Sequence, residues 1–82
     1  MYYNQMVTPE QIKIWIEAGL PGSRVQVSGD GHHFEAVVIN DVFALKNKVQ
    51  RHRLVYAALG QRMQTEIHAL SLQTLTPEEV KS

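Results

Sequence analysis

The strongest constraint on the fold is a stretch between Val49 and Leu59 in which apolar residues recur at helical spacing. Such spacing predicts an amphipathic helix that packs one side against the rest of the chain. His52 falls within the apolar stripe, which favours a packed, hydrogen-bonded histidine over a ligand. At about 100° per residue, the residues that we expect to face the core are Val49, His52, Val55, Tyr56, Leu59 and Met63.

A basic region surrounds the start of this helix. The whole chain carries eight basic and eight acidic residues and has a formal net charge of zero, yet residues 42–65 contain no Asp or Glu. Arginines near a helix start gain nothing from the helix dipole, so a partner is one reason to keep them there. The residues that we predict to contact phosphates or an acidic protein surface are Lys46, Lys48, Arg51 and Arg53.

Size and composition limit the chain to one small core. Its 82 residues suffice for a single domain, and the absence of cysteine excludes disulfides and thiolate ligands from this chain. No apolar run approaches the roughly 20 residues that span a bilayer, and the first residues lack the pattern of a secretory signal. We therefore expect a soluble cytoplasmic protein with no membrane partner, a flexible N-terminus over residues 1–7 and one domain over residues 8–82.

Two four-residue signals predict where further helices begin. Thr8-Pro9-Glu10-Gln11 and Thr76-Pro77-Glu78-Glu79 each combine a threonine cap, a proline and a third residue able to complete a capping box. They predict a helix over about residues 9–18 and a short C-terminal helix. A short helix capped by Asn40 or Asp41 is expected over residues 41–45. Gly60 predicts that the central helix either frays there or continues to Met63.

Alternating apolar residues predict three strands, over residues 23–28, 33–40 and 67–74. The turn signal Gly29-Asp30-Gly31 joins the first two as an antiparallel hairpin. The third strand returns after helices, so it can run parallel to one of the others. The predicted order is α-β-β-α-α-β-α, an α+β fold with one three-stranded sheet covered by helices on one face.

The four histidines are the main candidates for chemistry, and no catalytic motif joins them. The sequence has no His-Glu-x-x-His pair, no glycine-rich phosphate loop and no cysteine nucleophile, so we do not predict an enzyme. His32 and His33 lie at the rim of the hairpin turn, and His68 begins the third strand on the face of Leu70. Two histidines fall short of the three or four protein ligands of an isolated zinc site, so a partner would have to complete the shell of any metal.

Four segments resemble the BolA family, and the match runs from about Thr8 to Glu79. The resemblance identifies residues 8–82 as a BolA-like domain and implies the class II KH-like form of the α+β fold. The sequence departs from the family at Leu45, where glycine is common. The matching segments are GDGHHF at 29–34, VQRHRLVYAAL at 49–59, EIHALSL at 66–72 and TPEE at 76–79.

The resemblance also implies a function, that of an adaptor which partners a monothiol glutaredoxin to coordinate a shared [2Fe-2S] cluster in iron-sulfur cluster trafficking or iron/redox sensing. By position, His68 matches the family's near-invariant ligand and His33 the ligand of a variable loop, with His32 as the fallback. Imidazole can replace thiolate on one iron of such a cluster. The glutaredoxin cysteine and glutathione would hold the other iron. We therefore expect no cluster on the chain alone, which is expected to be a monomer or weak homodimer when free.

The alternative function is a nucleic-acid-binding transcriptional regulator that uses the basic helix on DNA. The KH-like topology and the regulatory roles of some family members favour it, but the chain lacks the Gly-x-x-Gly loop with which KH domains clamp a backbone. Binding to phosphates should weaken steeply with salt and depend on Arg51 and Arg53, whereas cluster sharing should depend on His68.

Overall fold

The computed structural model describes residues 7–81. The predicted N-terminal lead-in therefore lies outside the described residues except for Val7, which is buried in the core. The elements follow one another in the order α1 (Pro9–Gly19), β1 (Arg24–Gly29), β2 (His33–Ile39), the 3-10 helix η1 (Asp41–Phe43), α2 (Lys48–Leu59), α3 (Arg62–Thr65), β3 (Ala69–Leu75) and α4 (Pro77–Lys81). This order confirms the predicted α+β arrangement and adds α3, because α2 ends at Gly60 with φ 61° instead of continuing to Met63.

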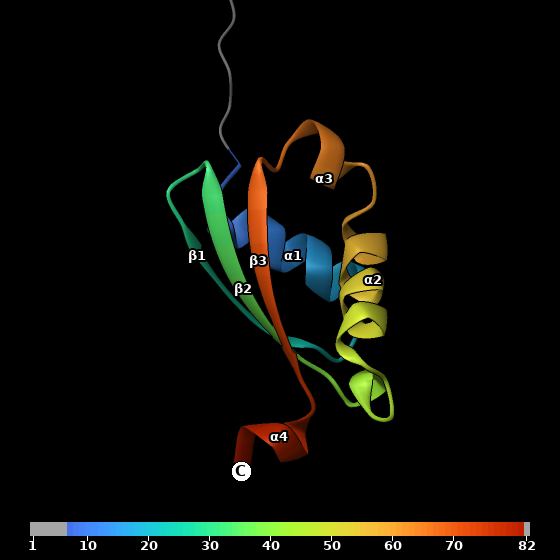
Figure 1. The fold of residues 1–82 in the computed structure, drawn as a ribbon. Helices are drawn as coiled ribbons and strands as arrows, with labels where there is room; N and C mark the ends of the chain where they lie inside the picture. Colours follow the sequence, from blue (N-terminus) through green and yellow to red (C-terminus); the bar gives the residue numbers. More distant parts are fainter. Residues whose placement is uncertain (1–6, 82) are drawn as a thin grey trace, which may run out of the picture.

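The three strands form one sheet in the order β1-β2-β3, so β2 is central. β1 and β2 are antiparallel, whereas β2 and β3 are parallel and pair His33 with Ala69. The helices between β2 and β3 supply the long connection that a parallel pair requires. α1 and α2 lie against one face of the sheet and leave the other face open (Figure 1). The predicted layering is confirmed, and the class II KH-like label stays a prediction.

Capping boxes start three of the helices. At α1, the Thr8 hydroxyl accepts the N–H of Gln11 at 3.2 Å, and the Gln11 side chain accepts the N–H of Thr8 at 2.9 Å. Thr76 and Glu79 make the same pair of bonds at α4, as predicted. Asn47 starts α2 with a further box that was not predicted from the sequence. Each box satisfies backbone donors that a helix start otherwise leaves unpaired.

The core lies between the sheet and the two long helices, and it corrects the predicted stripe of α2. Val55 and Leu59 are fully buried, but Val49 is 58% exposed and Tyr56 is 39% exposed. These two residues lie roughly 100° around the helix from Val55, outside the face that meets α1. The largest fully buried side chains are Phe34, Phe43, Ile12, Ile16, Leu59, Val38 and Val55.

The third strand begins later than predicted. β3 starts at Ala69, so His68, which was predicted to begin the strand on the face of Leu70, lies just before the strand and is exposed. Its neighbour Ile67 is 4% exposed and fixes the approach to the strand in the core. Leu70 packs against the core as the alternation predicted. Across residues 7–81, no helix combines the length and the apolar character needed to cross a bilayer.

Candidate functional site

The turn between β1 and β2 is held by the side chain of Asp30. One carboxylate oxygen accepts the backbone N–H groups of His32 and His33, both at 2.9 Å. These donors, His33 first and His32 second, hold the pKa of Asp30 below its usual value. The backbone N–H of Asp30 donates in turn to the carbonyl of His33 at 3.2 Å. The two turn histidines are therefore carried on a fixed backbone.

The parallel pairing of β2 with β3 brings His32 to His68. His33 pairs with Ala69, so the residues one position earlier on each chain are also opposite each other. The imidazole rings of His32 and His68 lie with their centroids 5.6 Å apart and their planes tilted by 32°. Both residues are exposed, at the end of the sheet where β2 and β3 begin. The structure therefore places two imidazoles together on an accessible edge.

His33 has different surroundings. Side chains alternate along a strand, and Phe34 is fully buried, so His33 lies on the open face. Its Nε2 atom lies 3.4 Å from the Ser71 hydroxyl on β3. The family resemblance favours His33 over His32 as the loop ligand, whereas the geometry brings His32 next to His68. The choice between them as ligands stays a prediction.

The spacing of the two imidazoles suits a shared metal ion. Imidazole nitrogens bind zinc at about 2.0 Å, so two rings on one tetrahedral ion would have centroids roughly 5 Å apart. The observed 5.6 Å is close to that value. Among residues 7–81, no three or more His, Cys, Asp or Glu side chains are grouped to hold a metal ion. If a metal ion binds here, His32 and His68 could supply two of its ligands, and another molecule would supply the rest.

The predicted basic patch divides into two parts. Arg51 forms an internal ion pair with Glu79, at 2.7 Å, and its guanidinium also donates to the carbonyls of Lys46 and Thr74. It therefore joins the start of α2 to β3 and α4. Its hydrogen bonds to Glu79, together with the bond from the backbone N–H of Thr76, lower the pKa of that carboxyl to about 2. For Lys48 and Arg53, no ion pair is found within the described chain.

His52 lines a hollow between the start of α2 and β3. Its Nε2 atom is buried without a hydrogen-bond partner in the described structure. Burial lowers its pKa, and the positive charge of Lys48 lowers it further. The predicted packed position is confirmed, whereas the predicted hydrogen bond is missing at this nitrogen.

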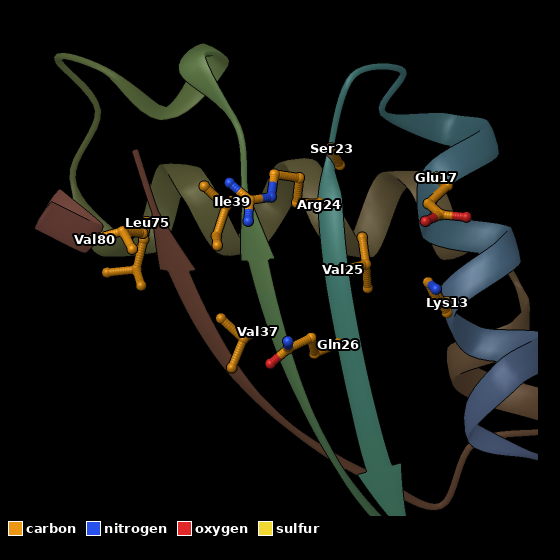
Figure 2. Close-up of a pocket in the computed structure, with 10 residues that line it drawn as sticks. All are labelled: Lys13, Glu17, Ser23, Arg24, Val25, Gln26, Val37, Ile39, Leu75 and Val80. Atoms are coloured by element: carbon orange, nitrogen blue, oxygen red, sulfur yellow. The ribbon is translucent and has the colours of Figure 1, made fainter. Parts of the chain in front are cut away.

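A second hollow lies on the open face, at the opposite end of β2 from His33. It is lined by the apolar side chains of Val37, Ile39 and Leu75, together with Val80 of α4 and Arg24 of β1 (Figure 2). None of the four histidines lines it. This hollow is therefore separate from the histidine pair.

Two contacts near the site were not predicted from the sequence. The hydrogen bonds that Asp30 accepts within the turn could have been predicted, because aspartate beside glycine often accepts N–H groups two and three residues ahead. The contact of Arg62 with Trp15, whose ring centroid lies 4.4 Å from the guanidinium carbon, joins residues 47 positions apart. No local pattern predicts such a distant pairing.

Comparison with known proteins agrees with the fold and with the sequence resemblance. A family model described as "BolA-like protein" matches residues 4–79. BolA-like protein 1 of Bos taurus is 36% identical over 77 residues, which cover 94% of this chain and 55% of that protein. The DNA-binding transcriptional regulator BolA of Haemophilus influenzae is 41% identical over 54 residues, 66% of this chain and 52% of that protein.

The chain thus spans about half the length of these two curated relatives. The solved structure of a bolA protein homologue from Coxiella burnetii has a TM-score of 0.88 and 58% sequence identity. That match covers 94% of this chain and 100% of the other. The family model covers well over half of the sequence, and the matching structure has the same fold. The chain therefore belongs to the BolA family.

Proposed function

We propose that this protein is an adaptor that partners a monothiol glutaredoxin to coordinate a shared [2Fe-2S] cluster, in iron-sulfur cluster trafficking or iron/redox sensing. The observation that carries the proposal is the exposed pair of His32 and His68, with ring centroids 5.6 Å apart. Imidazoles can replace thiolates on one iron of such a cluster and raise its reduction potential. A glutaredoxin cysteine and glutathione would supply the ligands that this cysteine-free chain lacks.

His68 and His32 are the ligands that we favour. They approach each other from β3 and from the β1–β2 turn, whereas His33 lies against Ser71 on the open face. The hydrogen bonds from the turn backbone to Asp30 would keep His32 in place before the partner arrives. A preorganised ligand loses less entropy on binding.

The test is anaerobic cluster reconstitution of the purified chain with a monothiol glutaredoxin and glutathione, followed by visible absorption and circular dichroism. We expect a spectrum distinct from that of the glutaredoxin homodimer, which His68→Ala and His32→Ala remove. His33→Ala is the matched control and should retain most of the signal. A homodimer spectrum with the wild-type chain would contradict cluster sharing, and loss with His33→Ala alone would reverse the choice of loop ligand.

The alternative is a DNA-binding regulator, and one observation favours it. Two bacterial relatives, from Haemophilus influenzae and Escherichia coli, carry the name DNA-binding transcriptional regulator BolA. Because Arg51 is engaged with Glu79, Lys46, Lys48 and Arg53 would make the phosphate contacts. Three such contacts predict that the logarithm of the affinity falls with log salt with a slope of roughly −3. Fluorescence anisotropy with a labelled DNA duplex at several salt concentrations measures that slope, and Arg53→Gln should reduce it by about one.

A further inference from the structure

The segment that carries His68 has few attachments of its own. α3 has no buried residue, and Gln61 gives its start no side-chain cap. Met63 is the one apolar side chain of α3, and it packs against the core while only partly buried. A four-residue helix without a side-chain cap or a fully buried residue is marginal by itself. The position of the segment therefore depends on the contacts that its neighbours make with the rest of the chain.

Arg62 makes contacts of two kinds. Its guanidinium lies over the ring of Trp15 in α1, 4.4 Å from the ring centroid. Its backbone carbonyl accepts the N–H groups of both Glu66 and Ile67 at 2.9 Å each. Arg62 thus connects the middle of α1 to the residue immediately before His68.

The position of Trp15 is fixed by packing against the core. It lies between Ile12 and Ile16 on α1, both of which are fully buried, and it packs against the core itself. A guanidinium over an aromatic face is attracted by the ring, and the attraction grows as solvent is excluded. The buried side chain of Ile67 fixes the distance of residues 62–68 from the core. The contact between Arg62 and Trp15 adds a second fixed point, which limits rotation about the first.

We infer that Arg62 and Trp15 are positioning residues that hold His68 opposite His32. Ile67 is buried in the core and Arg62 is held against Trp15, and these two contacts together define the direction in which His68 leaves the core. The inference rests on the proposed ligand role of His68, because positioning matters for function only if that imidazole binds a cluster. α1 thereby gains a role in the site, because Trp15 of α1 contacts Arg62, whose carbonyl holds the residue before His68.

The test uses the free protein first. The amide exchange rates of Glu66 and Ile67 report on their bonds to the Arg62 carbonyl, and the ring shifts of His68 report on its contact with His32. We expect Arg62→Gln to speed both exchange rates between about twofold and thirtyfold, the range that corresponds to loss of one cation–π contact. The rates of core amides in β2 should not change, and the ring shifts of His68 should move.

Three further variants complete the design. Trp15→Leu should act like Arg62→Gln, whereas Arg62→Lys keeps a cation and should restore part of the protection. Arg53→Gln removes an exposed arginine from α2 and is the matched control. Exchange rates and His68 shifts that stay at wild-type values in both Arg62→Gln and Trp15→Leu would overturn the inference, as would an equal effect of Arg53→Gln.

Cluster reconstitution with monothiol glutaredoxin and glutathione then separates the inference from the proposed function. We expect Arg62→Gln to give a weaker form of the shared-cluster spectrum, and Arg24→Gln, which removes an exposed arginine at the start of β1 far from the histidine pair, to give the full signal. A full shared-cluster signal with Arg62→Gln, despite faster amide exchange, would overturn the role of the contact between Arg62 and Trp15 in placing His68 for the cluster. If His68→Ala leaves the spectrum unchanged, the proposal that His68 is a ligand fails, and the functional part of the inference fails with it. The exchange data still show whether the contact between Arg62 and Trp15 positions His68.

Discussion

The close crossing of α1 and α2 predicts an unusual response to a small substitution. A Cβ atom built on Gly19 would lie 2.5 Å from the Cβ and 2.7 Å from the Cα of Ala58, where ordinary contacts begin at 3.4 Å. Gly19→Ala would therefore force the helices apart by about 1 Å, and overpacking of this kind costs about 1–3 kcal/mol. The helix propensity of alanine returns at most about 1 kcal/mol. Gly19 is the last residue of α1, so only part of that return applies, and we expect a net loss of about 1–2 kcal/mol.

Thermal unfolding followed by circular dichroism measures this loss. For a domain of this size, 1 kcal/mol shifts Tm by roughly 4–8 °C, so Gly19→Ala should lower Tm by roughly 4–16 °C. Ala18→Gly, one residue earlier on an exposed position, is the control for helix propensity and should itself destabilise by up to about 1 kcal/mol. Adding Ala58→Gly to Gly19→Ala should cost less than the sum of the single changes, because the two residues share one contact. A Gly19→Ala protein as stable as the wild type would refute the close crossing.

Three further predictions concern titration and strain. The pKa of Glu79 is lowered from 4.5 to about 2, so its contribution to stability is present above pH 4.5 and is lost as the pH falls towards 2; urea unfolding at several pH values should show a flatter dependence for Glu79→Gln in that window. Burial lowers the pKa of His52 below its ordinary 6.5, so stability should decline as the pH falls below that value, and equal slopes for wild type and His52→Gln would contradict this. Leu45 is fully exposed with φ 64°, a left-handed conformation, so Leu45→Gly should raise stability by up to about 1 kcal/mol, and a lower Tm would show that the conformation is not strained.

Local signals in the sequence account for most of the secondary structure. The boxes of Thr8 and Thr76 were predictable because their hydrogen bonds reach only three residues along the chain. The hairpin followed from the Gly-Asp-Gly turn between two alternating stretches. These interactions depend on backbone geometry within one turn, so neighbouring residues suffice to specify them.

The tertiary structure decided which distant residues meet. The parallel register of β2 and β3 makes His32, and not His33, the neighbour of His68. Arg51 was predicted to contact a partner, but it forms an internal ion pair with Glu79, which lies 28 residues further along the chain. The crossing of α1 at Ala58 selects the buried face of α2. The sequence by itself determined the elements, the family and the candidate histidines, because these depend on local geometry and on matching motifs. Which of the candidate histidines lie side by side depends on how the elements pack together, and only the tertiary structure decides that.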